Sequence, residues 1–168
     1  IFSDRVEKFV PPRKGRAHVL RVLRELFYHK PEGRGTDIAR ALEYLTHVVR
    51  RRAVAFLVSD FMSDGFEKPM SVAGRRHDLI AVRLSDQREE SLPPLGYVEF
   101  EDAETGELFM ANTSDSRFRA EFEEGAVKAR EGLQRTFRRS CVDVIDIQTD
   151  ESYVQPLMRF FKERERRF

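Results

Sequence analysis

Short apolar runs constrain the fold of this 168-residue chain more than any other feature. Residues 53–59 carry no charge, and residues 78–84 and 142–147 are similarly rich in branched apolar side chains. Each run is too short for a core helix and is typical of a strand buried on both faces, as in parallel sheets that helices cover. Because helical patterns separate these runs, the sequence predicts βαβ units and an α/β fold.

Helical spacing of apolar residues predicts helices at 16–29, 37–49, 66–76, 116–139 and 152–165. Alternation predicts a short strand at 5–10, before two prolines, and a hairpin of strands 97–101 and 107–111 joined by residues 102–106. Thr36 is expected to be the N-cap of the second helix, with Asp37 in its first turn. We expect a single domain with an α/β core (1–94), a hairpin insertion (95–112) and a helix-strand-helix end (113–168).

Two helices have apolar stripes that we expect to face the core. The stripe of the long helix is Phe118, Phe122, Ala126, Ala129, Leu133 and Phe137. The inward residues of the last helix are Val154, Leu157, Met158 and Phe161.

Composition excludes several classes of function. The chain has 30 Lys and Arg against 29 Asp and Glu, so basic groups such as 50–52 and Arg75-Arg76-His77 are interpreted as solvated surface, not as a nucleic-acid interface. The single Cys141 excludes an intrachain disulfide and a cysteine-rich zinc site. No apolar run approaches the roughly 20 residues that span a bilayer, and no signal peptide is evident, so we expect a cytoplasmic location and no membrane segment.

Thr36 and Asp60 are the first candidate site. Asp60 ends the strand predicted at 53–59, and ligands of open α/β sheets bind beyond the carboxyl ends of strands. A hydroxyl and a carboxylate suit Mg²⁺ or Ca²⁺, with Ser59 and Ser63 as weaker candidates. The alternative is structural: Thr36 as a plain helix cap and Asp60 as a loop acid bonded to backbone amides.

Four segments, in order, resemble a bacterial family, the domain of unknown function fifty-eight, which has a von Willebrand factor A-type domain. They are Phe-Ser-Asp-Arg-Val-Glu at 2–7, Phe-Val-Pro-Pro-Arg-Lys-Gly-Arg at 9–16, Gly-Thr-Asp-Ile-Ala-Arg-Ala-Leu-Glu-Tyr-Leu at 35–45 and Arg-Arg-Ala-Val-Ala-Phe-Leu-Val-Ser-Asp-Phe at 51–61. The resemblance covers at least residues 1–84. It implies a three-layer, Rossmann-like fold with a mostly parallel sheet.

The resemblance also implies a metal-ion-dependent adhesion site for Mg²⁺. That site uses an Asp-x-Ser-x-Ser loop after the first strand, a Thr, and an Asp at the end of the fourth strand. Thr36 and Asp60 match the last two, whereas Asp-x-Ser-x-Ser is absent and would lie upstream of Ile1. We therefore expect a domain that lacks its first strand, with the complete Mg²⁺ site belonging to the intact protein.

The implied function is non-enzymatic: a partner's carboxylate takes the open position on the metal. Genes of the family typically neighbour MoxR-type AAA+ ATPases, so the expected partner is such an ATPase or its client. A competing interpretation from the residues is a metal-dependent phosphohydrolase or nuclease centred on Asp60 and Asp64, with Asp37 and Asp86 nearby. Without the first strand, we expect direct pairing of the remaining strands, a swapped partner chain such as a homodimer through the exposed edge, or a disordered N-terminus.

Overall fold

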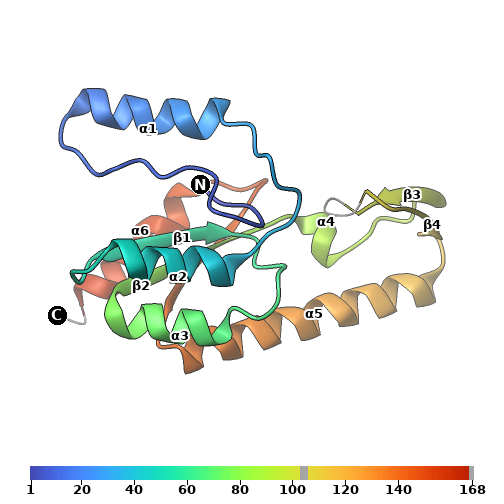
Figure 1. The fold of residues 1–168 in the computed structure, drawn as a ribbon. Helices are drawn as coiled ribbons and strands as arrows, with labels where there is room; N and C mark the ends of the chain where they lie inside the picture. The colour runs from blue at the N-terminus through green and yellow to red at the C-terminus, as the bar shows by residue number, and fades with distance from the viewer. Residues whose placement is uncertain (103–105, 167–168) are drawn as a thin grey trace.

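A three-stranded parallel sheet forms the centre of the fold (Figure 1). The computed structural model describes residues 1–102 and 106–166. The strands lie in the order β1-β2-β5, with bounds β1 Val54–Ser59, β2 Asp78–Ser85 and β5 Asp143–Gln148. Phe56 lies opposite Ile80, and Val82 opposite Ile145. The α/β class and the parallel sheet are therefore confirmed, each strand within one residue of its predicted bounds.

Helices cover both faces of the sheet, which gives three layers (Figure 1). The helices that contribute to the two cores are α2 Ile38–Val48, α3 Glu67–Arg76, α5 Ser116–Arg139 and α6 Val154–Glu165. On one face, buried side chains of α2, α3 and the end of α5 pack against β1 and β2 around Leu42, Met70 and Phe137. On the other face, Leu157 and Phe160 of α6 pack against a smaller buried cluster that includes Ile80.

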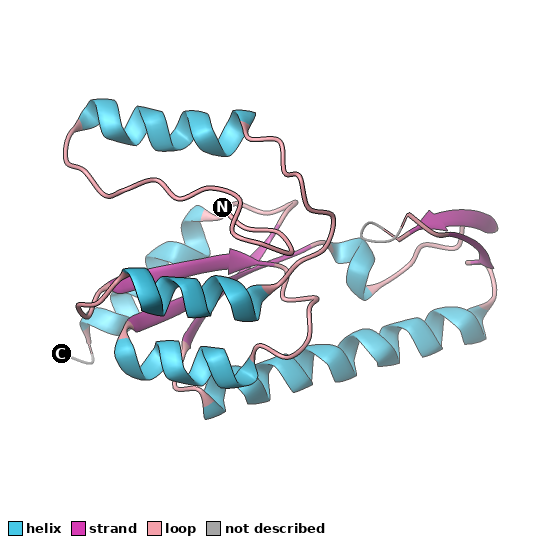
Figure 2. Cartoon of the chain, in the orientation of Figure 1, coloured by secondary structure: helices cyan, strands magenta, loops and turns pink. Residues whose placement is uncertain are grey.

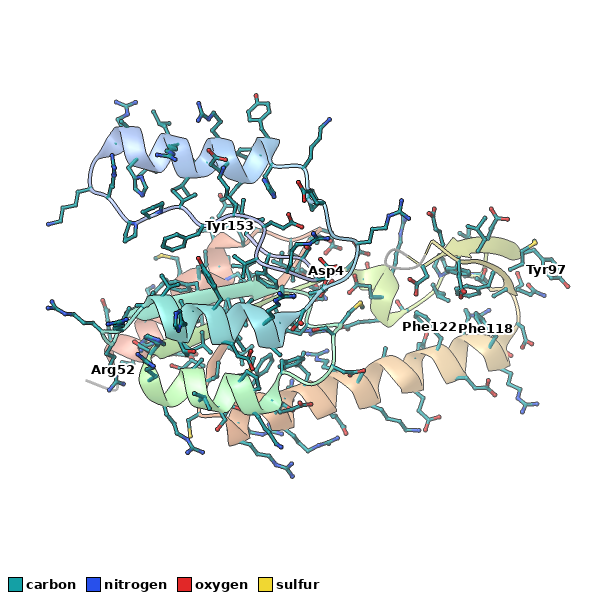
Figure 3. All side chains as sticks on the ribbon, in the orientation of Figure 1. Asp4, Arg52, Tyr97, Phe118, Phe122 and Tyr153 are labelled. Carbon is teal, nitrogen blue, oxygen red and sulfur yellow. The ribbon has the colours of Figure 1, made fainter. Side chains whose placement is uncertain are left out.

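A hairpin extends from the sheet at the far end of α5 (Figure 2). Its strands are β3 Tyr97–Glu101 and β4 Leu108–Asn112, close to the predicted bounds, and residues 103–105 of the predicted turn lie outside the described residues. Thr113 anchors its base, because the Thr113 hydroxyl accepts from the Leu95 N–H (2.9 Å) and donates to the Gly96 carbonyl (3.0 Å). Phe118 and Phe122 of α5 point toward the hairpin (Figure 3).

The stripes predicted for the two C-terminal helices are only partly buried. In α5, Phe137 is buried but Ala129 is exposed, because the first half of this helix lies beyond the sheet, under the hairpin (Figure 1). In α6, the inward residues are Leu157 and Phe160. The prediction was wrong for Val154, Met158 and Phe161, which are about half exposed, because α6 contacts the sheet through a narrow stripe only.

The strand predicted at 5–10 is absent; the segment is a loop with one isolated bridge between Phe2 and Val6. A strand needs a neighbour for its backbone, and none of the described strands lies beside this segment. The next element, α1 Arg16–Tyr28, forms as predicted but stands away from the sheet (Figure 1). None of its side chains is buried, and Phe27 is 81% exposed.

The prediction that β1 is buried on both faces was also wrong. Within the described residues β1 pairs only with β2, so it is an edge strand. Val54, Phe56 and Val58 are 59%, 49% and 51% exposed, because no helix covers their side of β1. Direct pairing of the remaining strands does not replace the expected first strand, because β2 pairs with β1 and β5 and no described strand lies on the other side of β1.

Candidate functional site

A groove of about 800 Å³ runs along the open edge of β1. We call it the edge groove. Its lining includes Ala41 and Leu45 of α2, together with Phe2, Phe9 and Leu26 from the N-terminal segment and α1. Thr36 and Asp60 both line this groove. The two residues that the sequence singled out therefore share the lining of one groove, which extends along the whole of β1.

Asp60 follows β1 directly and is held by a short hydrogen-bonded turn. Its Oδ1 accepts hydrogen bonds from the Ser59 hydroxyl (3.2 Å) and the Met62 N–H (3.1 Å). Ser59 Oγ in turn accepts from the Phe61 N–H (3.1 Å). The structural alternative, a loop acid bonded to backbone amides, therefore holds for one of the two carboxylate oxygens.

Phe61 anchors this turn in the core. Its backbone adopts φ 61°, a left-handed conformation that is rare for a bulky residue. The ring is buried and meets Phe137 edge to face, with 5.1 Å between ring centroids, and it also contacts Phe66. Because the Phe61 ring is buried, it holds the preceding residue, Asp60, in place at the end of β1.

Thr36 was predicted to cap α2, and that prediction was wrong. The helix begins at Ile38, so Asp37 occupies the cap position, and Asp37 Oδ1 accepts from the Arg40 N–H (2.8 Å). The Asp37 N–H also donates to the Ser3 carbonyl (2.8 Å), which ties this helix start to the N-terminal segment. Thr36, one residue earlier, lies half-buried in the edge groove.

Glu7, which sequence reasoning did not single out, organises the loop that carries Thr36. Its side chain is 4% exposed, and Oε1 accepts from the Ser3 hydroxyl (2.6 Å), the Gly33 N–H (2.9 Å) and the Glu32 N–H (3.2 Å). These bonds, led by the one from Ser3, lower the pKa of Glu7 and keep it charged. In the sequence Glu7 is one polar residue in the alternation at 5–10, which predicted a strand and gave no sign of these contacts.

The oxygen ligands available in the edge groove are of the type that a hard cation binds, but they are too few to hold one. Thr36 and Asp60 offer oxygen ligands, and Ser63 Oγ is buried with no hydrogen-bond partner among the described residues. Mg²⁺ takes about six oxygens, several of them from water. No group of three or more His, Cys, Asp or Glu side chains suited to a metal ion occurs in the described part of the chain.

Two of the four acids in the hydrolase interpretation, Asp37 and Asp86, cap helices instead. Asp37 caps α2, as described above. Asp86 accepts from the Arg88 N–H (2.9 Å) and the Thr149 hydroxyl (2.8 Å), and with Glu89 it forms a capping box at α4 Gln87–Glu90.

His77 also borders the edge groove, at the junction of α3 and β2. It is 1% exposed, and neither ring nitrogen has a hydrogen-bond partner among the residues described. Burial, with a smaller contribution from the positive charge of Arg76, lowers the pKa of His77 and favours the neutral ring. His77 is therefore not part of a basic surface with its arginine neighbours, because its ring points inward.

Comparison with known proteins identifies the family. Residues 1–132 match the family described as "Protein of unknown function DUF58". The chain belongs to this DUF58 family. It is 32% identical over 160 residues to uncharacterized protein MAV169 of Mycobacterium avium, with 94% of each chain covered. It is 31% identical to uncharacterized proteins Mb1516 of Mycobacterium bovis and Rv1480 of Mycobacterium tuberculosis, and the match spans 50% of their length.

No solved structure matches the chain. Among the described helices, none combines the length and apolar character that a membrane crossing requires.

Proposed function

We propose that this DUF58 chain is a non-enzymatic protein-interaction module with a von Willebrand factor A-like fold and a Mg²⁺-dependent adhesion site at Thr36 and Asp60. The observation that carries the proposal is that both side chains line one groove, next to the carboxyl end of β1. This is the edge at which open parallel sheets bind their ligands.

In this proposal, the Thr36 hydroxyl and the Asp60 carboxylate supply hard oxygen ligands, and a partner carboxylate replaces a water on the cation. The Asp60 turn is anchored by the buried Phe61, so the carboxylate is presented without much loss of conformational freedom. Resemblance to the family supports a MoxR-type AAA+ ATPase, or its client, as the partner. An ATP-consuming partner favours a cytoplasmic location.

The hydrolase interpretation has less support. A two-metal hydrolase needs several carboxylates that converge on one point. Asp37 and Asp86 are engaged as helix caps, and the described residues hold no acidic cluster suited to a metal.

A binding assay tests the proposal. The full-length protein is immobilised, and retention of the neighbouring MoxR-type ATPase is measured in Mg²⁺ and in EDTA. We expect EDTA, Asp60→Ala and Thr36→Val each to reduce binding at least about tenfold.

Asp64→Ala is the matched control, because Asp64 is an exposed acid in the same loop. The adhesion mechanism predicts that this variant binds normally. Binding that survives both the chelator and Asp60→Ala would contradict the mechanism.

A further inference from the structure

A second groove lies under the hairpin and shares no lining residue with the edge groove. It has a volume of about 1020 Å³, and we call it the hairpin cleft. Its lining includes Val98 and Phe100 of β3 and Phe122, Ala126 and Ala129 of α5. Phe122 points toward the hairpin (Figure 3). Because the alanine side chains that follow it are short, the space between the hairpin and this part of α5 stays open.

The elements that bound the hairpin cleft are held in place by contacts of their own. Thr113 lines the cleft and anchors the hairpin through the hydroxyl bonds described above, and its carbonyl accepts from Arg119 Nη1 of α5 (2.6 Å). The Phe100 ring stacks on Phe109 of β4, with 5.2 Å between ring centroids. The hairpin is thus tied to α5 at its base. A cleft with fixed walls binds an occupant at a smaller cost in conformational freedom.

The charged side chains that line the hairpin cleft are already engaged. Asp86 and Glu89 bond reciprocally in the capping box of α4, and Glu121 pairs with Arg117 (3.1 Å). Hydrogen bonds, led by the one from the Arg88 N–H, lower the pKa of Asp86, and the positive charge of Arg88 adds a smaller effect. These groups therefore serve one another, and apolar surface is what the cleft offers to an occupant.

The hairpin cleft adjoins the turn that carries Asp60. Met62 lines the cleft, and its N–H donates to Asp60 Oδ1 (3.1 Å), whereas Asp60 itself lines the edge groove. Asp86, which directly follows β2, also lines the cleft. The cleft therefore lies at the carboxyl ends of β1 and β2, the same end of the sheet as the proposed cation site.

The rim of the hairpin cleft favours a protein segment over a small molecule as the occupant. Met62 and Leu95, which line the cleft, are 65% and 71% exposed. Sites for small molecules usually enclose about 70–90% of their ligand, and a cleft with such an open rim leaves one side of a small ligand in water. A polypeptide can fill the cleft and cover its apolar rim at the same time.

We propose that the hairpin cleft receives bulky apolar side chains, aromatic ones in particular, of the partner protein whose carboxylate binds at the cation site. The inference rests on the proposed function for the existence of that partner, and it deepens it by naming a second feature of the partner. The recognised segment carries an acidic residue with aromatic residues close by. Aromatic side chains that enter a desolvated apolar pocket supply much of the affinity of protein interfaces.

Methyl NMR with N-acetyltryptophanamide as the probe tests the hairpin cleft by itself. The full-length protein is labelled at the methyl groups of methionine and alanine and titrated with the probe. We expect saturable shifts of Met62, Ala126 and Ala129, which line the cleft, and none of Ala120, which is on α5 but does not line it. EDTA should leave these shifts unchanged, because the cleft itself needs no cation.

Two tryptophan variants connect the hairpin cleft to partner binding. Ala129→Trp fills the cleft, and Ala120→Trp is its matched control, because both alanines are exposed on α5 and Ala120 lies outside the cleft. We expect Ala129→Trp to weaken both probe binding and retention of the MoxR-type ATPase in Mg²⁺ at least about tenfold, and Ala120→Trp to leave both within about twofold. If Ala129→Trp does not fold by circular dichroism, Leu95→Lys at the rim replaces it.

The outcomes separate this inference from the cation site. Retention of the ATPase that EDTA abolishes and Ala129→Trp leaves unchanged would overturn the inference and leave the adhesion mechanism standing. Absence of saturable shifts, or shifts confined to Ala41 and Ala55 of the edge groove, would also overturn it. Saturable shifts that Ala129→Trp abolishes, without any retention of the ATPase, would support the cleft as a site for aromatic side chains and count against the ATPase as the partner.

Discussion

Replacement of Phe137 by alanine tests how the core positions Asp60. The Phe137 side chain is 2% exposed, packs in the main buried cluster and meets the Phe61 ring edge to face. Removal of a buried phenylalanine ring costs about 3–5 kcal/mol, because apolar contacts are lost and a cavity remains. For a chain of this size that loss lowers Tm by roughly 6–20 °C.

Urea and thermal unfolding followed by circular dichroism measure this loss, with Phe161→Ala as the matched control. Phe161 is 46% exposed, so its removal should cost about 1 kcal/mol or less. A double-mutant cycle with Phe61→Ala should give a coupling of about 0.5–1.5 kcal/mol for the ring pair. In addition, amide exchange at Met62, whose N–H donates to Asp60, should accelerate in Phe137→Ala. Equal losses for Phe137→Ala and Phe161→Ala, or unchanged Met62 exchange, would refute the reasoning.

Three further predictions concern single residues. Burial, together with the positive charge of Arg76, lowers the pKa of His77 in the folded chain. Because the unfolded chain therefore binds the proton first, the free energy of unfolding should fall as the pH drops below about 6.5. Urea unfolding of His77→Leu at several pH values should show no such fall. Hydrogen bonds from the Arg88 N–H and the Thr149 hydroxyl lower the pKa of Asp86. The stabilisation that the charged Asp86 gives the fold is therefore present above about pH 3.9 and is lost as the pH falls further. Acid unfolding of Asp86→Asn should lack this loss. A β-carbon at Gly33 would overlap Asp4 Oδ1, so Gly33→Ala should displace the N-terminal segment and speed its cleavage by protease, while Gly125→Ala, with open space around it, should not.

Helices in which apolar residues repeat regularly over many turns could be predicted well from the sequence. The bounds of α5 coincide with the predicted 116–139, because its apolar stripe repeats over many turns. The short helix α4 was missed, although Asp86 and Glu89 have the spacing of a capping box. The strand predicted at 5–10 failed for a physical reason: alternation marks a face but does not supply a neighbour, and Glu7 instead binds the loop at 32–33.

Asp60 was singled out by the rule about strand ends, and the family pattern supported Thr36; their role in a metal site stays a prediction. Thr36 and Asp60 line one groove even though 23 intervening residues separate them in the chain. The contacts of Glu7 and the burial of His77 depend on which distant segments pack together. A local sequence pattern does not contain this information. The same holds for the cap of α2, where a shift of one residue exchanged the roles of Thr36 and Asp37.

The apolar residues of β1 and α1 that remain exposed lie on neighbouring parts of the molecule. Val54, Phe56 and Val58 of β1 and Leu23, Leu26 and Phe27 of α1 are apolar residues that helical or strand patterns assign to a core, and all are exposed. Chains rarely expose two such apolar faces without a use for them. Leu26 and the three β1 residues line the same groove. The sequence patterns therefore identified side chains that are apolar enough to be buried, but a local pattern does not specify which element covers them.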